Sequence, residues 1–484
     1  MTPLVQISPR PRHHLALPTF LGIGASIFLA GWIGSAHANA ADATPSPRAT
    51  RPPNIVFILA DDLGYGDLGC YGQQRIHTPN IDRLAAEGVI FTQFYAGNTV
   101  CTPSRCALMT GFHVGHCSMR ANGDEVNGFH SPTVATLLKQ AGYDTAIIGK
   151  WGLADTGWPG VPNKQGFDFF FGYLNNMHAH NYYPTFLWRN DRKEPLKNVV
   201  PNEGASGQGV ATVKVEYSAD ICAVEATEYI EGRKDKTKPF FLYLPFTIPH
   251  ANDEAKNEGM EVPDLGEYEH KDWPAPEKGF AAMVTRLDRY VGEIRKQLQR
   301  SGLDDNTLVI FTSDNGPHKE GGQDPAFFKS WGKLRGMKRD LTEGGIREPM
   351  IVYWPGHTHA GTTCDYIGGF QDFLPTALAF AGAPAAAKTD GLNFIPAIEG
   401  RMDAQPKHDY LYWEFYERKG AQAVRQGDWK AIRTPAFTGK VALFDLKSDL
   451  HEDHDVAADH PEVVMKMEQI MQEAHTPREV PKKP

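Results

Sequence analysis

Apolar runs of strand length recur along most of the chain, and polar residues stand at or just beyond their ends. The runs and the polar residues after them are 54–60 before Asp61 and Asp62, 145–149 before Lys150, 240–244 before His250, 307–312 before Asp314 and Asn315, and the run 350–354. A continuous apolar run is typical of a strand buried on both faces of a sheet. Because parallel strands end at the same edge of a sheet, these polar residues predict a site along that edge.

Segments with helical periodicity lie between the runs. We expect helices over residues 79–88, 131–142, 280–298 and 372–381. The second has Ser131 as its N-cap and Pro132 at the first helical position, both favoured there, and Gly142 at its end. Strands that alternate with helices predict an α/β fold, with a large, mostly parallel sheet between layers of helices.

The pattern changes after about residue 400. Short strand-like runs follow without intervening helices at 410–416, 421–425, 429–433 and 441–446, and a helical segment, 461–474, comes last. They predict a small antiparallel sheet with one helix. We therefore expect a main domain over residues 54–400 and a small C-terminal α+β subdomain over residues 401–484.

The N-terminus has the layout of a secretory signal peptide. Arg10 and Arg12 precede an apolar stretch, and small residues follow it up to Ala38 and Ala40. This predicts a signal peptide over residues 1–40, a flexible tether over 41–53, and a periplasmic or secreted protein with no stable membrane span after cleavage. The alternative is an uncleaved membrane anchor, because the apolar stretch is nearly long enough to span a bilayer.

Composition and charge exclude some classes of partner. Hydrophobic residues make up 41% and charged residues 22%, which is ordinary for a soluble globular enzyme. The net charge is -9 and no block of Lys and Arg stands out, so nonspecific nucleic-acid binding is not expected. The six cysteines contain no C-x-x-C spacing, which argues against a zinc ribbon or a thioredoxin motif, although they could pair in an oxidising compartment.

The most informative motif is Cys101-Thr-Pro-Ser-Arg105, followed by Ala-Leu-Met-Thr-Gly at residues 107–111. Alone, C-x-P-x-R is a short pattern that also fits an ordinary Cys at a helix N-terminus. Together the two segments resemble the sequence that directs oxidation of cysteine to formylglycine in the sulfatase family.

Other blocks of the chain resemble the same family in the same order. They are residues 58–67, with Asp61 and Asp62; Gly149-Lys150-Trp151; residues 313–316, with Asp314 and Asn315; Lys338, just before residues 343–349; and residues 425–430. The resemblance covers roughly residues 54–470, and its collinear order is more specific than any one motif. It implies an alkaline-phosphatase-like fold, a catalytic domain over residues 54–400 and hydrolysis of sulfate esters.

Four of these residues suit a hard divalent cation. Asp61, Asp62, Asp314 and Asn315 offer only oxygen ligands, which favour Ca²⁺ or Mg²⁺ over Zn²⁺. We predict one Ca²⁺ per chain, with residue 101 completing the site as the resemblance implies. The alternative for paired Asp residues at a strand end is a cap or a turn.

The resemblance also implies roles for individual residues. A maturation enzyme would convert Cys101 to formylglycine, whose hydrate attacks sulfur and then expels sulfate. The other implied roles are charge stabilisation by Arg105, a bridge from Lys150 to sulfate, protonation of the leaving alcohol by His250 with help from Lys338, and deprotonation of the nucleophile by Asp314.

One position departs from the family pattern. The family's lysine block usually reads G-K-W-H-L-G, and its histidine is thought to contact the nucleophile and aid sulfate expulsion. Here Gly152 stands in its place. His178 and His180 are the candidates to replace it, and the alternative is that both are ordinary polar residues of an aromatic-rich loop.

The natural substrate is expected to be a sulfated carbohydrate. Aromatic segments near the catalytic blocks contain Trp188 and Trp331, and aromatic faces stack on sugars. The alternative is a purely structural role, in which these aromatic side chains pack inside the domain. Two other functions remain open. One is hydrolysis of phosphate or phosphonate monoesters. The other is binding of sulfated glycans without turnover, and Gly152 is the one feature that favours it.

Overall fold

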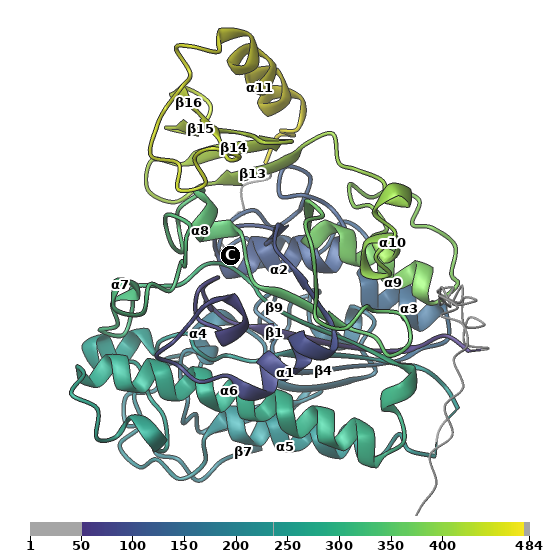
Figure 1. Cartoon of the computed structure of the whole chain (residues 1–484). Coiled ribbons are helices and arrows are strands. Elements are labelled where there is room, and N and C mark those ends of the chain that lie inside the picture. Colours follow the sequence, from purple (N-terminus) through teal and green to yellow (C-terminus); the bar gives the residue numbers. More distant parts are fainter. Residues whose placement is uncertain (1–50, 236, 479–484) are drawn as a thin grey trace, which may run out of the picture. The chain divides into compact units, whose positions relative to one another are not determined.

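A ten-stranded sheet runs through the main domain, in the order β11-β2-β10-β9-β1-β8-β4-β5-β6-β7 (Figure 1). The strands are β1 (Asn54–Ala60), β2 (Val89–Phe91), β4 (Asp144–Lys150), β5 (Phe169–Tyr173), β6 (Phe186–Arg189), β7 (Arg192–Pro195), β8 (Phe240–Pro245), β9 (Thr307–Ser313), β10 (Met350–Tyr353) and β11 (Thr362–Cys364). The central strands β9, β1, β8, β4 and β5 are parallel, whereas β10 and β6 run antiparallel to their neighbours. The predicted α/β fold with a mostly parallel sheet is confirmed.

The register brings the ends of the central strands together. Ala60, the last residue of β1, pairs with Ser313, the last residue of β9. Leu59 pairs with Pro245, the last residue of β8. The residues that follow these strands therefore leave the sheet at one edge, as their sequence pattern predicts.

Helices cover both faces of the sheet (Figure 1). One group contains α1 (Pro79–Glu87), α5 (Ser218–Glu231) and α6 (Ala275–Arg300), and the other contains α2 (Cys101–Thr110), α3 (Val134–Gln140) and α9 (Phe373–Phe380). Side chains of β1 alternate between two hydrophobic cores: Val56 and Ile58 belong to one, and Ile55 and Phe57 to the other. This explains why β1 is a continuous apolar run.

Helix α3 begins later than its sequence predicts. Thr133, not Ser131, is the N-cap, and its hydroxyl accepts a hydrogen bond from the backbone N–H of Thr136. Ser131 and Pro132 therefore precede the helix. Helix α6 begins at Ala275, directly after Pro274, which is earlier than the predicted start at residue 280.

The C-terminal subdomain has the predicted architecture. Its antiparallel sheet contains β13 (Leu411–Phe415), β14 (Ala421–Gln426), β15 (Trp429–Thr434) and β16 (Lys440–Asp445), and α11 (Pro461–Glu473) packs on it. The shorter elements are β3 (Phe94–Tyr95), β12 (Gly368–Gly369), α4 (Asn176–Ala179), α7 (Pro325–Phe328), α8 (Glu343–Ile346) and α10 (Ile395–Ile398).

This computed structural model describes residues 51–235 and 237–478. The predicted signal peptide and all but the last three residues of the predicted tether lie outside these ranges. Within them, no helix combines the length and apolar character needed to cross a membrane. The six cysteines all lie within them, and each is free.

Candidate active site

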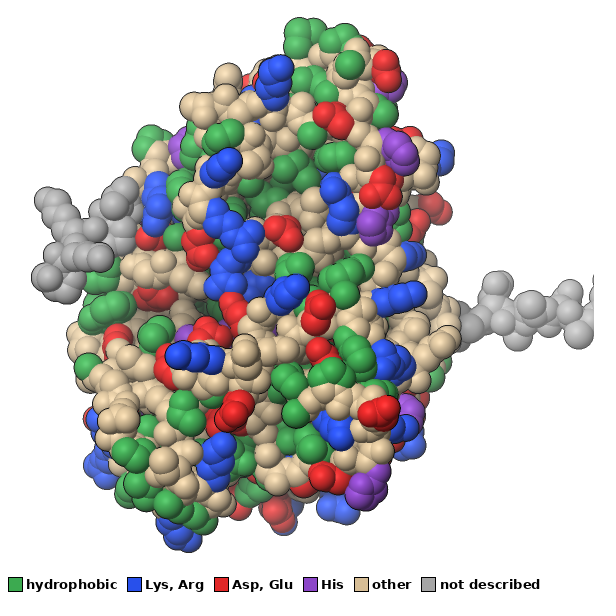
Figure 2. Space-filling model, turned by 90° about the vertical axis from the view of Figure 1, so that its left-hand side faces the viewer, with side chains coloured by type: hydrophobic (Ala, Val, Ile, Leu, Met, Phe, Trp, Pro, Cys, Tyr) green, Lys and Arg blue, Asp and Glu red, His purple; other side chains and the backbone are tan. Residues whose placement is uncertain are grey.

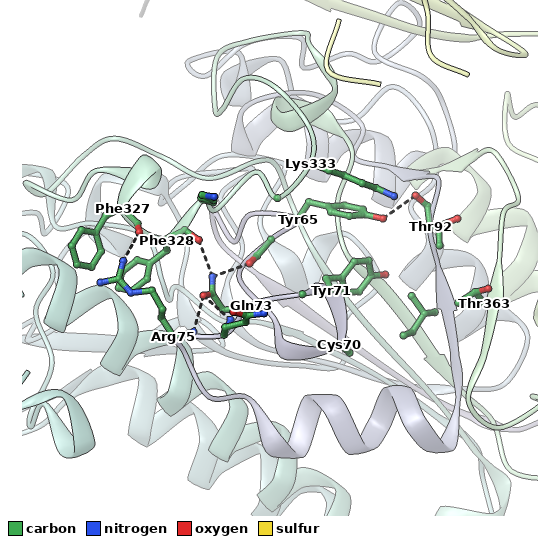
Figure 3. Close-up of a pocket in the computed structure, with 16 residues that line it drawn as sticks. Tyr65, Cys70, Tyr71, Gln73, Arg75, Thr92, Phe327, Phe328, Lys333 and Thr363 are labelled. Atoms are coloured by element: carbon green, nitrogen blue, oxygen red, sulfur yellow. Dashed lines mark hydrogen bonds between the residues drawn. The ribbon is translucent and has the colours of Figure 1, made fainter. Parts of the chain in front are cut away.

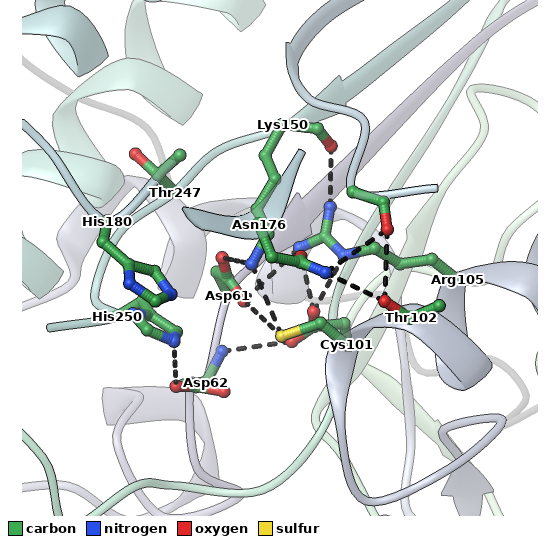
Figure 4. A network of polar contacts seen from close by, with 12 residues as sticks. Asp61, Asp62, Cys101, Thr102, Arg105, Lys150, Asn176, His180, Thr247 and His250 are labelled. Carbon is green, nitrogen blue, oxygen red and sulfur yellow. Dashed lines mark hydrogen bonds and ion pairs between the residues drawn. The ribbon is translucent and has the colours of Figure 1, made fainter. Parts of the chain in front are cut away.

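A cavity of about 340 Å³ contains several of the residues that the sequence singles out. Cys101, Lys150, His180, His250 and Lys338 all line it. They come from segments far apart in the sequence, since Cys101 begins α2, Lys150 ends β4 and His250 follows β8. Figure 4 shows these three residues close to Asp61 and Asp62.

Four buried groups converge at the floor of this site. Ligand atoms of Asp61, Asp62, Cys101 and Asp314 all lie within 4.8 Å of one another. Asn315 lies beside them, and its Nδ2 donates a hydrogen bond of 2.6 Å to Asp62 Oδ1. Among the described residues, its Oδ1 is buried without a hydrogen-bond partner.

This cluster fits a divalent cation. Burial, together with the charge of Asp61, raises the pKa of Asp314 to about 7, and a bound cation would oppose both effects. An amide oxygen without a donor, beside three carboxylates, is an oxygen-rich ligand set of the kind that Ca²⁺ prefers. The residues that would hold the ion are therefore Asp61, Asp62, Asp314 and Asn315, as their sequence pattern predicts.

Cys101 is the first residue of α2, so the motif lies at a helix N-terminus as well as in the site. Its Sγ lies 3.3 Å from Asp61 Oδ1 and 3.4 Å from Lys150 Nζ. Burial and the charge of Asp61 raise the pKa of the thiol, so the unmodified residue is not a thiolate nucleophile.

Arg105 lies one turn later on α2 and is fully buried. Its Nε donates a hydrogen bond to Asp314 Oδ2 at 3.0 Å, and its Nη2 forms an ion pair with the same oxygen at 2.8 Å. Its Nη1 donates to the backbone oxygen of Lys150 at 2.8 Å. Arg105 therefore positions Asp314 and the end of β4.

Two lysines supply charge on opposite sides of the paired acids. Lys150 Nζ lies 2.7 Å from Asp61 Oδ2, and Lys338 Nζ lies 2.9 Å from Asp62 Oδ2. Burial disfavours a charged Lys338, but Asp62 and Glu320 outweigh burial and raise its pKa. Lys338 is therefore an ammonium at neutral pH.

His250 is held in one tautomer. Its Nδ1 lies 2.6 Å from the backbone oxygen of Ala251, and its Nε2 lies 3.0 Å from Lys338 Nζ. Burial, reinforced by the charge of Lys338, lowers the pKa of His250 to about 3. A neutral imidazole with Nδ1 protonated and Nε2 accepting from Lys338 satisfies both contacts.

The two candidate histidines have different surroundings. The ring of His180 stacks on that of His250 at 5.1 Å and lines the cavity. His178 instead packs between Tyr173 and Phe186, with ring centroids 4.8 and 4.5 Å away. It does not line the cavity, and burial lowers its pKa to about 3.

The structure does not bring the two predicted tryptophans into the cavity. Trp188 lies in β6, buried against Phe186. Trp331 is half-buried and lies outside the cavity lining. The tryptophan that does line the cavity is Trp158, in a loop that no sequence motif marks.

Several other residues of the site belong to no sequence motif. Glu320 accepts from Lys338 Nζ at 2.8 Å, and Asn176 and Glu125 line the cavity. Asn176 lies two residues before His178, in the loop that the sequence marks only by its histidines.

A larger cavity, of about 730 Å³, lies elsewhere and shares no lining residue with this one (Figure 3). Tyr65, Tyr71, Phe327, Arg75 and Lys333 line it. It contains none of the grouped metal-ligand atoms of the described residues, so the smaller cavity is the better candidate for the active site.

Basic side chains gather near the active site. Figure 2 shows Lys and Arg clustered near the middle of one face, below the C-terminal subdomain. A cavity of about 540 Å³ between residues 335–342 and the C-terminal sheet is lined by Arg335, Arg339, Arg418 and Lys419. Arg339 also lines the active-site cavity, so the two cavities adjoin.

Comparisons with known proteins agree with this site. The family described as sulfatase matches residues 53–383, and the family described as the C-terminal part of N-sulphoglucosamine sulphohydrolase matches residues 336–477. N-acetylgalactosamine-6-sulfatase of Rattus norvegicus is 33% identical over 412 residues, covering 79% of this chain and 72% of that protein. Arylsulfatase A of Homo sapiens is 32% identical over 477 residues and 87% of each chain.

A solved structure extends the likeness to the fold. The crystal structure of Ps i-CgsB has a TM-score of 0.73 and 28% identity, over 87% of this chain and 92% of that one. The sulfatase match alone covers more than half of the chain. The chain therefore belongs to the sulfatase family, with an alkaline-phosphatase-like fold, and is a sulfuric ester hydrolase.

Proposed function

We propose that this sulfatase removes sulfate from a carbohydrate, with a formylglycine made from Cys101 and a Ca²⁺ held by Asp61, Asp62, Asp314 and Asn315. The observation that carries the proposal is the buried cluster of three aspartates and Cys101, with all ligand atoms within 4.8 Å of one another. Two buried lysines flank it, as an anionic substrate requires.

The cation and the formylglycine would supply the chemistry, and side chains of the chain would position the reacting groups. When present, the cation offsets charge on the sulfate and polarises it, and the hydrate of formylglycine supplies the nucleophilic oxygen. Lys150 lies 3.4 Å from Cys101 Sγ, close enough to contact both the nucleophile and a bound sulfate oxygen. Arg105 holds Asp314, which accepts the proton of the attacking hydroxyl.

The leaving alcohol needs a proton, and His250 is placed to supply it. Lys338 donates a hydrogen bond to His250 Nε2, so the two side chains hold one proton between them. The departing oxygen takes this proton as it approaches the pair, and the Lys338 ammonium is its source. Carboxylate oxygens of Glu320 and Asp62 lie 2.8 and 2.9 Å from Lys338 Nζ and fix its position.

Two observations support a carbohydrate substrate. One relative is an N-acetylgalactosamine-6-sulfatase, and Ps i-CgsB has been solved with k-i-k-neocarrahexaose, in a structure 30% identical to this chain with a TM-score of 0.72. The cavity beside the active site offers Arg335 and Lys419 to further anionic groups of such a chain, whereas its other two cations already pair with acidic side chains. A phosphonate monoester hydrolase of Agrobacterium radiobacter is only 20% identical, and that likeness concerns the fold alone.

A substrate panel tests this proposal. Release of sulfate from sulfated mono- and disaccharides and from an aryl sulfate, and release of phosphate from an aryl phosphate, should be measured, with Cys101→Ala as the inactive control. We expect the highest kcat/KM on a sulfated saccharide. A higher kcat/KM on the aryl sulfate would contradict the carbohydrate assignment, and faster turnover of the aryl phosphate would favour the phosphoester alternative.

Export belongs to the same proposal. We propose cleavage near Ala40 and maturation by a formylglycine-generating enzyme before or during export. The residues concerned, 1–40, lie outside the described ones, and the argument rests on their sequence pattern. N-terminal sequencing of protein from its native host should begin near Ala41, whereas an intact leader would contradict cleavage.

A further inference from the structure

Gly152 leaves a space beside Lys150 that another residue fills. Its φ is +71°, and a Cβ added there would lie 2.8 Å from Asn176 Oδ1 and 3.5 Å from Lys150 Cε. A contact of 2.8 Å is shorter than real Cβ atoms tolerate. A side chain at residue 152 would therefore enter the space that the Asn176 amide occupies.

The orientation of the Asn176 amide is fixed by its partners. Its Nδ2 donates to Thr102 Oγ1 at 2.9 Å, to Glu125 Oε1 at 3.1 Å and to the Gly152 backbone oxygen at 3.4 Å. The Thr102 hydroxyl already donates to Glu125 Oε1, at 2.6 Å, so all three partners act as acceptors. A flipped amide would place its oxygen against them, so Oδ1 must point the other way.

That oxygen has no donor within the described chain. Asn176 Oδ1 is buried and makes no hydrogen bond to any described residue. Asn176 lines the same cavity as Cys101 and Lys150 and lies beside both (Figure 4). Leaving a buried acceptor without a hydrogen bond costs free energy. This oxygen therefore indicates a donor from outside the folded chain.

We propose that Asn176 takes the place of the histidine that the family pattern has at Gly152. Its Oδ1 accepts a hydrogen bond from a hydroxyl at residue 101, a step that rests on the proposed function. An amide oxygen orients such a hydroxyl but cannot remove its proton at neutral pH. Asn176 is thus a non-titrating substitute, and Thr102 and Glu125 position it.

A double-mutant cycle on stability tests the shared space without any turnover. Gly152→His, Asn176→Gly and the double variant are compared by thermal unfolding. We expect Gly152→His to lower the melting temperature in the natural background and to have much less effect in the Asn176→Gly background. Histidine is among the residues that tolerate a positive φ, so the double variant can fold. Additive effects would overturn the proposal that the two side chains compete for one space.

A second cycle, on kcat, tests the catalytic contact. Asn176→Ala should lower kcat about 100-fold with little change in KM. The double variant Gly152→His/Asn176→Gly should regain at least tenfold in kcat over Asn176→Gly, because histidine restores a polar group beside residue 101. An unchanged kcat in Asn176→Ala, or no recovery in the double variant, would overturn this contact.

Asn198→Ala is the matched control. Asn198 is also buried, and its Nδ2 donates to the backbone oxygens of Pro184 and Glu216, away from the cavity. It should lower the melting temperature and leave kcat unchanged. If the protein hydrolysed no sulfate ester at all, the stability cycle would still report on Asn176, so failure of the proposed function is distinguishable.

Discussion

The proposed function assigns Asn315 and the three aspartates beside it to a bound Ca²⁺. Removing Ca²⁺ with a chelator should abolish activity and lower the melting temperature, because a ligand that binds only the folded state stabilises it. Asp61→Ala or Asp314→Ala should lower kcat/KM by at least about 100-fold, the usual scale for losing one preorganised charge-stabilising group. Activity assays and thermal unfolding with and without Ca²⁺ measure both effects.

Asp191→Ala is the control for those acids, because Asp191 is exposed and lies in the turn between β6 and β7. It should change neither activity nor the response to Ca²⁺. Recovery of chelated enzyme by Zn²⁺ alone, and not by Ca²⁺, would show that the ligand set has been misread.

At the residue scale, sequence could identify groups that sit in ordered motifs. Cys101, Asp61 and Asp314 belong to such blocks, and the structure brings them together. Asn176 could not be found this way, because its proposed role depends on the space beside Gly152 that its amide fills, which only tertiary contact creates. The choice between His178 and His180 also needed the fold, since α4 turns the first into an aromatic core and leaves the second at the cavity.

At the scale of elements, Lys430 on β15 joins the C-terminal sheet to α8. Its Nζ lies 2.8 Å from Glu343 Oε1 and 3.2 Å from Glu452 Oε1, and all three side chains are fully buried. Lys430→Met removes the cation that these two buried carboxylates share and leaves only Arg347, at 3.1 Å from Glu343, so it should cost about 3–5 kcal/mol of unfolding free energy. Denaturant unfolding measures it.

Lys440→Met, at an exposed position of β16, is the matched control and should be close to neutral. A loss for Lys430→Met no larger than for this control would mean that the buried ion pairs do not fasten the C-terminal sheet to α8.

The elements that sequence predicted well are those with strong patterns. Buried strands such as β1 and β9 are continuous apolar runs and were found almost to the residue. The edge strand β7 reads Arg-Lys-Glu-Pro and lies mostly exposed, so no hydrophobic pattern marks it. The start of α3 was misplaced because Ser131 and Thr133 both suit an N-cap, and only the fold selects Thr133.

At the scale of the whole molecule, the parallel sheet explains how residues from 61 to 338 in the sequence form one site. Strands β1, β8 and β9 end at the same edge, so the segments after them meet there. The C-terminal subdomain adds basic residues to the cavity that adjoins the site. The polar residues at the ends of the strands predicted that these segments form one site. The adjoining cavity could not be predicted, because it depends on how residues 335–342 and the C-terminal sheet face each other.

The mass of the proteolytic peptide that carries Cys101 tests the central claim most directly. The protein should come from its native host or be made together with a formylglycine-generating enzyme, and the peptide that carries Cys222 serves as the unmodified control. We expect the Cys101 peptide to have the mass of formylglycine, in a fraction that matches the fraction of active enzyme. Fully active protein whose Cys101 peptide keeps the mass of cysteine would contradict the account.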